Sequence, residues 1–230
     1  QHSILNFYRD DFGKYASKIR HTHMRRILER TPGLIGEHFK YVKIDPETGS
    51  RELKIALDYL VRAELIHKVY ESNASGLPLN AFINEKKFKL LLLDIGLVQA
   101  MSLLSPNLLL KEDLMQVNQG ALAEQFVGQE LTAYQPPYIE SQLYYWERNK
   151  LGSMAEVDYV MNIDENILPI EVKSGKTGSL RSLQLFLNEK KAKLGIRLSL
   201  KPLSFENGVL SIPLYMIHEL PRLVRELLQI

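Results

Sequence analysis

Cysteine is absent from all 230 residues of the chain, which excludes disulfide bonds and zinc sites built from thiolates. A chain without disulfides is typical of a reducing compartment, and we expect a cytoplasmic location. The sequence also has no signal peptide and no apolar run of ~18 residues, so we expect no membrane partner. The formal net charge is only +2, a value that neither favours nor excludes nucleic acid as a partner.

A complete nucleotide-binding loop is missing as well. The run Ser174–Gly178 reads Ser-Gly-Lys-Thr-Gly, which looks like the end of a phosphate-binding loop. A Walker A motif needs a glycine five residues before its Gly-Lys pair, and that position holds Ile170. We therefore expect no ATP site in this chain.

The stretch Ala155–Lys173 combines a predicted β-hairpin with an unusual set of charges. The stretch 157–163 is rich in β-branched and aromatic residues and 167–172 is largely apolar, with the turn-forming triplet Asp-Glu-Asn between them. Alternation along each strand puts Glu156 and Asp158 on one face of the first strand, and Glu171 and Lys173 on one face of the second. If the two faces coincide, three carboxylates and an ammonium group share one pocket.

Such a pocket suits a hard divalent cation. Charges beside core-facing residues are costly unless they form pairs or hold a metal. Mg²⁺ takes few protein carboxylates and keeps several waters, so we expect Mg²⁺ or Mn²⁺ at Asp158 and Glu171, with Glu156 as a further ligand. Lys173 is then placed to orient a water that attacks a phosphodiester.

These residues resemble those of a known family. Asp158, a spacer, and then Glu171-Val172-Lys173 look like the PD-(D/E)XK nuclease signature, in which the acidic residues hold the metal and the lysine assists the water. The longer run from Glu156 to Leu187 resembles the nuclease-like domain of unknown function found at the C-terminus of many prokaryotic AAA-type ATP-binding proteins. In this chain Val-Asp replaces the Pro-Asp of the motif, which leaves open whether Glu156 or Asp158 is the ligand.

The resemblance implies a further acidic residue and a further domain. The family often supplies another catalytic acid from a helix before the hairpin, and Glu124 matches that position; the alternative is an edge glutamate that only forms a salt bridge. The resemblance also implies an N-terminal ATPase domain as a partner, and the start at Gln1 rather than Met leads us to expect a fragment of a longer protein.

The N-terminal half predicts two helices followed by a β-ribbon, the order of a winged helix. The second helix, which begins near Ser50, carries Arg51, Lys54 and Arg62 opposite its apolar stripe, and these three residues are candidates for DNA contact. The ribbon is expected from strands at 65–70, 79–83 and 88–93. The resemblance also implies a winged-helix-like segment here.

The predicted fold class is thus α/β, with a winged-helix-like domain at 1–117 and a PD-(D/E)XK restriction-endonuclease-like domain at 118–230. We expect Asn118 to cap a helix over 119–133, and a later helix to present Arg181 and Gln184 either to the phosphate or to solvent. The predicted function is metal-dependent hydrolysis of DNA by part of an AAA-type ATPase. The alternative is a catalytically inactive module that binds DNA or protein for that ATPase.

Overall fold

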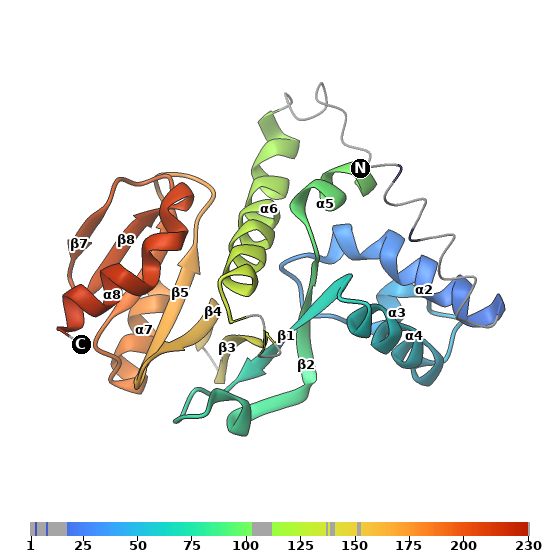
Figure 1. Ribbon diagram of the computed structural model, residues 1–230, viewed down its shortest axis with the longest axis horizontal. Helices are drawn as coiled ribbons and strands as arrows, with labels where there is room; N and C mark the ends of the chain where they lie inside the picture. Colours follow the sequence, from blue (N-terminus) through green and yellow to red (C-terminus); the bar gives the residue numbers. More distant parts are fainter. Residues whose placement is uncertain are drawn as a thin grey trace. The chain divides into compact units, whose positions relative to one another are not determined.

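The computed structural model describes residues 18–102, 112–136, 141–150 and 153–229, together with Ser3, Tyr8 and Tyr138. The fold is mixed α/β, as predicted, and it contains an eight-stranded mixed sheet with the strand order β2-β1-β3-β4-β5-β6-β8-β7 (Figure 1). The strands are β1 (Ile66–Ser72), β2 (Ile83–Leu92), β3 (Leu143–Lys150), β4 (Ser153–Ile163), β5 (Asn166–Val172), β6 (Gly195–Ser199), β7 (Ser204–Glu206) and β8 (Val209–Pro213).

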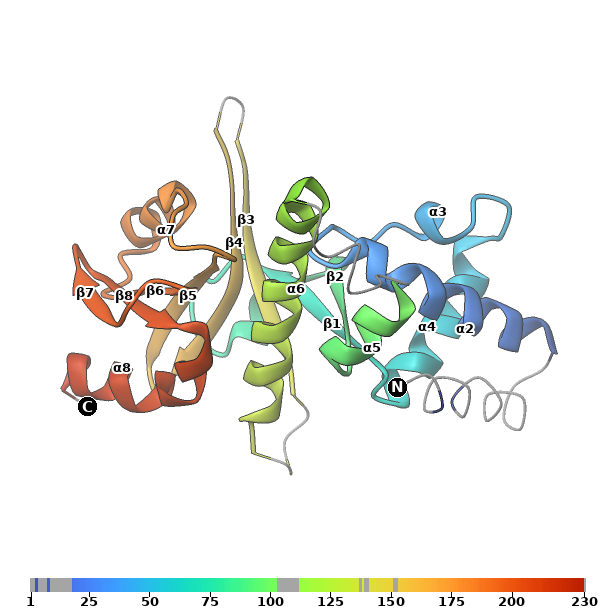
Figure 2. The same ribbon diagram turned by 90° about the horizontal axis from the view of Figure 1, so that it is seen from above.

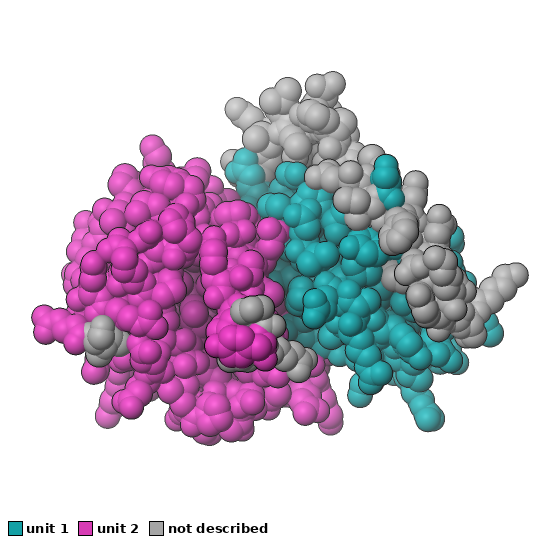
Figure 3. Space-filling view, in the orientation of Figure 1, with its two compact units in different colours: residues 1–68, 89–125 teal, residues 69–88, 126–230 magenta. Residues whose placement is uncertain are grey.

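The chain divides into two compact units, which Figure 3 shows in different colours. Unit 1 comprises Gln1–Lys68 and Lys89–Gln125, and unit 2 comprises Val69–Phe88 and Phe126–Ile230. Strands β1 and β2 and the helix α6 (Glu112–Ala133) each contribute residues to both units. No helix within the described residues is both long and apolar enough to cross a membrane.

Unit 1 is built from helices with apolar stripes. Among its described residues, the helices are α2 (Lys18–Arg30), α3 (Tyr41–Ile44), α4 (Ser50–Arg62), α5 (Ile95–Met101) and the first part of α6, with the 3₁₀ helix η1 (Thr31–Leu34). Helices α2 and α4 pack together, and Ile27, Leu53, Leu57 and Leu60 are fully buried. The spacing of the three α4 leucines places them on one helical face, which explains why this helix binds to the core along that face.

A buried glutamine closes the end of β2 within unit 1. Gln125 is fully buried on α6, and its amide forms two hydrogen bonds with the backbone of Leu92. The Leu92 N–H donates to Gln125 Oε1 over 3.0 Å, and Gln125 Nε2 donates to the Leu92 carbonyl over 2.7 Å. Both polar groups of the side chain are therefore satisfied in an otherwise apolar environment.

In unit 2, helices cover both faces of the sheet. Helix α7 (Arg181–Lys190) and helix α8 (Leu220–Leu228) lie on opposite faces of the part formed by β5, β6 and β8, and β3 and β4 extend past them as a long hairpin (Figure 2). A 3₁₀ helix, η3 (Leu214–Glu219), leads into α8.

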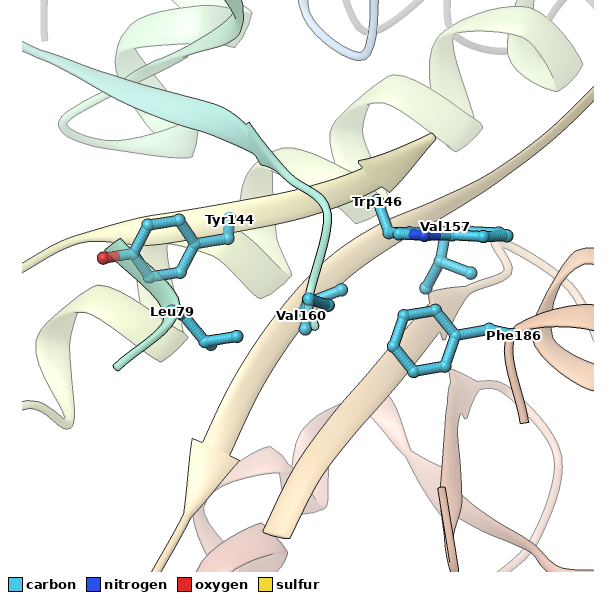
Figure 4. Close-up of a cluster of buried hydrophobic side chains, with 7 residues drawn as sticks. Leu79, Tyr144, Trp146, Val157, Val160 and Phe186 are labelled. Carbon is cyan, nitrogen blue, oxygen red and sulfur yellow. The ribbon is translucent and has the colours of Figure 1, made fainter. Parts of the chain in front are cut away.

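The core on the α7 side is aromatic. Phe186 of α7 packs edge-on against Trp146 of β3, with ring centroids 5.1 Å apart and an interplanar angle of 83°. Val157 and Val160 of β4 belong to the same cluster, as do Ala74, Leu79 and Tyr144 (Figure 4). Edge-to-face contacts of this kind place the positive ring edge against the negative face, so they add to the gain from burying two large rings.

Two local expectations were wrong. Residues 79–83 do not form a strand: a 3₁₀ helix, η2 (Leu79–Phe82), begins there with a bond from the Ala81 N–H to the Pro78 carbonyl. Asn118 is not a cap, because it lies inside α6, which includes Glu112–Ala133.

Candidate functional site

The candidate site lies in unit 2, where β4 and β5 separate. The two strands pair in antiparallel register from Ile163–Asn166 to Tyr159–Ile170, so Asp158 and Glu171 lie just beyond the last pair. On its other side, β4 has a bulge: Val157 pairs with Trp146 and Val160 pairs with Tyr144, so three steps along β4 match two along β3. Such a bulge bends the strand and changes the direction of its side chains.

The structure brings Asp158 close to Glu171 and Lys173, and their roles in a site stay a prediction. Asp158 reaches across to β5, where its Oδ2 accepts a hydrogen bond of 2.7 Å from the Val172 N–H. Glu171 is only 6% exposed, and Lys173 Nζ donates to its Oε1 over 2.5 Å. The other oxygen, Glu171 Oε2, is buried and has no hydrogen-bond partner among the described residues.

The charges around Glu171 change its acidity. Burial first, and then the neighbouring Asp158 carboxylate, raise the pKa of Glu171 from 4.5 to about 7. Lys173 opposes this rise through its hydrogen bond and its charge, and Glu156 adds a smaller repulsion that also raises the pKa. Burial and like charge disfavour the ionised form, so Glu171 can carry a proton near neutral pH.

Glu156 belongs to the edge of this group. Glu156 on β4 lies opposite Glu147 on β3 in the register of the two strands. Lys87 Nζ lies 3.3 Å from Glu147 Oε2 and 3.4 Å from Glu71 Oε2. Burial and the charges of Glu147, Glu71 and Glu156, in that order, raise the pKa of the Tyr145 hydroxyl. The carboxylates of Glu156, Glu147 and Glu71 thus extend the acidic surface from Asp158 toward β1, and Lys87 neutralises part of their charge.

Glu124 lies in unit 1 and has its own surroundings. Its Oε2 is 3.7 Å from Nζ of Lys89, a lysine that is only 3% exposed. A Cβ placed on Gly36 would lie 3.1 Å from the same oxygen. Within its unit Glu124 therefore forms the salt bridge that was the alternative interpretation, and its catalytic role stays a prediction.

The candidate nucleic-acid contacts lie on helices. Arg51, Lys54 and Arg62 are exposed on α4, as the stripe pattern predicts. On α7, Arg181 is exposed and Gln184 is half-buried. Their accessibility is compatible with phosphate binding, and the contacts themselves stay predictions.

Sequence reasoning missed Arg197 and Gly178. Arg197 lies on β6 in parallel register with Glu171, is 6% exposed, and donates from Nη2 to the Lys176 carbonyl over 2.7 Å. A Cβ on Gly178 would lie 2.8 Å from Cδ of Lys173. An arginine inside the apolar strand Gly195–Ser199 is a signal that the sequence offers, because buried charge is rare without a partner.

The donor set fits a hard divalent cation in part. Mg²⁺ commonly uses one or two protein carboxylates, and Asp158 and the unbonded oxygen of Glu171 offer two close together. Within the described part of the chain, no three His, Cys, Asp or Glu side chains are grouped so that they could hold a metal ion. The fit therefore rests on the pair, and Glu156 as a third ligand stays a prediction.

Two family models match the chain, one in each half. Residues 119–217 match a domain of unknown function, DUF4143, and residues 1–108 match a second domain of unknown function, DUF8612. The two matches leave residues 109–118 unmatched, and this segment contains the domain boundary predicted at 117. The two compact units divide the chain at other positions. No curated protein and no solved structure matches the chain.

Proposed function

We propose that this chain is part of an AAA-type ATP-binding protein and carries a nuclease-like domain that hydrolyses phosphodiester bonds in DNA with the help of Mg²⁺ or Mn²⁺. The match to DUF4143, a domain found in proteins associated with AAA-type ATPases, supports the first part. The arrangement of Asp158, Glu171 and Lys173 supports the second. The proposal also includes the fold of each part: a winged-helix-like domain at 1–117 and a PD-(D/E)XK-like domain at 118–230.

One observation carries the proposal. Glu171 is almost completely buried, yet only one of its oxygens has a hydrogen-bond donor within the described residues. Leaving a buried carboxylate oxygen unsatisfied is costly, so such an oxygen is usually kept for a ligand. With the Asp158 carboxylate beside it, we infer that this oxygen serves to bind a cation.

Each side chain then has a distinct task. Asp158, in the middle of β4, is fixed by the Val172 N–H, and Glu171, near the end of β5, is fixed by Lys173. When bound, Mg²⁺ or Mn²⁺ would polarise the phosphate and make a bound water more acidic. Lys173, whose side chain is 26% exposed, can reach the same water and orient it toward the phosphorus.

The test is calorimetric titration of Mn²⁺ into the protein, followed by incubation with single- and double-stranded DNA. Asp158→Asn and Glu171→Gln keep the side-chain shapes and should each abolish Mn²⁺ binding and cleavage. Glu165→Gln, at an exposed glutamate in the turn between β4 and β5, is the matched control and should bind as the wild type does. Mn²⁺ binding that survives both substitutions would refute the proposal.

A second candidate is an inactive module that docks DNA or protein for the ATPase. It is favoured by the lack of a three-ligand group among the described residues and by the exposed basic residues on α4. It predicts that the protein binds DNA but does not cleave it at saturating Mn²⁺. The affinity for DNA should be unchanged in Glu171→Gln and lower in the double variant Arg51→Ala, Lys54→Ala.

A further inference from the structure

We propose that Gly178 and Arg197 are positioning residues that hold Lys173 against Glu171. They act through the loop of residues 174–180, which connects β5 to α7. The inference deepens the proposed function, because Lys173 is the residue that would orient the water. Its test measures how fast the Lys173 ammonium protons exchange with water and requires no cleavage of DNA.

The loop starts from a fixed point on β6. The Lys173 N–H donates to the Leu198 carbonyl over 2.8 Å, which continues the parallel pairing of β5 and β6. Two residues later, the Gly175 carbonyl accepts a hydrogen bond of 3.4 Å from the Leu200 N–H. The backbone on both sides of Lys173 is therefore tied to the neighbouring strand.

Arg197 holds the middle of the loop. Its guanidinium is buried on the face of β6 that meets α7, because a Cβ at Gly195, two residues earlier, would contact Leu183 of α7. From there Nη2 donates to the Lys176 carbonyl over 2.7 Å, and its Nε has no hydrogen-bond partner among the described residues. Burying an arginine for one bond to a neutral carbonyl is costly, which indicates that the bond serves to fix the loop.

Gly178 brings the loop backbone onto the lysine side chain. A Cβ at Gly178 would lie 2.8 Å from Cδ of Lys173 and 3.2 Å from its Cγ and Cε. The φ angle of Gly178 is +139°, a conformation that residues with a side chain rarely adopt. The backbone angle therefore requires glycine, and a side chain here would also push the Lys173 side chain aside, so the loop covers the aliphatic part of Lys173 at close contact.

Together these contacts restrict a side chain that is otherwise flexible. A lysine ammonium is carried by four carbons and can take many rotamers. The covering loop leaves Lys173 Nζ directed to Glu171 Oε1, at 2.5 Å. If the loop is displaced, the stem regains its freedom and the ammonium leaves the carboxylate.

The test is NMR of the lysine ammonium groups in ¹⁵N-labelled protein, with the Lys173 signal assigned by its loss in Lys173→Arg. The wild type should show a Lys173 NH₃⁺ signal that exchanges slowly with water. Gly178→Ala should speed this exchange by about tenfold or more, because the ammonium group loses one charge-assisted hydrogen bond. Gly175→Ala is the matched control in the same loop, because a Cβ there would meet no described atom within 4 Å.

Substitution of Arg197 gives the same test without changing a glycine. Arg197→Met should speed the Lys173 exchange as Gly178→Ala does, whereas Arg197→Lys keeps a donor and should restore slow exchange. The inference is overturned if Gly178→Ala and Arg197→Met both leave the signal unchanged, or if Gly175→Ala has the same effect as Gly178→Ala. A held Lys173 in a wild type that binds no Mn²⁺ would refute the proposed function but not this inference.

Discussion

Glu171 should make the protein less stable as the pH rises, and its replacement by glutamine should remove that loss. The pKa of Glu171 is raised from 4.5 to about 7, chiefly by burial. Between these two values the folded state keeps a proton that the unfolded chain releases. The free energy of unfolding therefore falls as the pH rises from about 4.5 to about 7, and it is constant above this window.

The size of the effect follows from the same shift. At ~1.4 kcal/mol for each pKa unit, the difference between 4.5 and about 7 corresponds to about 3 kcal/mol. Because glutamine has no proton to lose, the advantage of Glu171→Gln over the wild type should grow by about 3 kcal/mol across this window.

Urea unfolding in EDTA at pH 4.5, 6 and 8 measures this difference, and Glu165→Gln at the exposed turn is the control that should show no pH-dependent change. The reasoning is refuted if the gap between Glu171→Gln and the wild type is the same at all three pH values, or if it narrows as the pH rises.

The other predictions concern the same site and the two cores. The affinity for Mn²⁺ should increase as the pH rises toward about 7 and change little above it, because the proton on Glu171 competes with the cation; calorimetry at pH 6, 7 and 8 would contradict this with a flat profile. Lys173→Met should raise the pKa of Glu171 above about 7, which a ¹³C-carboxyl NMR titration measures; an unchanged pKa would show that the ion pair is absent in solution. Gln125→Ala should destabilise the protein by about 2–4 kcal/mol in urea, since it leaves two buried backbone groups of Leu92 without partners, and a loss below ~1 kcal/mol would contradict this. Phe186→Ala should cost about 3–5 kcal/mol in the same assay through the cavity it leaves, and a smaller loss would mean that the core collapses to fill it.

Local pattern was enough to predict the hairpin and its charged end. The runs at 157–163 and 167–172 fall within β4 and β5, and the mixed α/β class follows from the alternation of strands and helices. The grouping of Asp158 with Glu171 and Lys173 was also visible, because the turn between the strands fixes which residues meet. Spacing along a hairpin is local information, so one sequence contains it.

Contacts between distant segments were not accessible in the same way. The bulge in β4 depends on pairing with β3, and no residue type near Asp158 predicts a bulge. Arg197 becomes a neighbour of Glu171 only because β5 and β6 pair in parallel through the connection that contains α7. Gly178 reads as an ordinary turn residue until the Lys173 side chain is seen beneath it. Each depends on tertiary structure, which periodicity cannot show.

The hydrogen bonds of Gln125 also cover part of one edge of the sheet. Strands β2 and β7 are the two edges of the sheet, and an open edge can pair with a strand from another molecule. The Leu93 N–H points to the Leu65 carbonyl, so both backbone groups of Leu92 point to the opposite side, where the Gln125 amide takes them. At the other edge, β7 has only three residues. At the Leu92 end of β2, a strand from another molecule would have to displace the buried Gln125 amide, and at β7 it would have only three residues with which to pair.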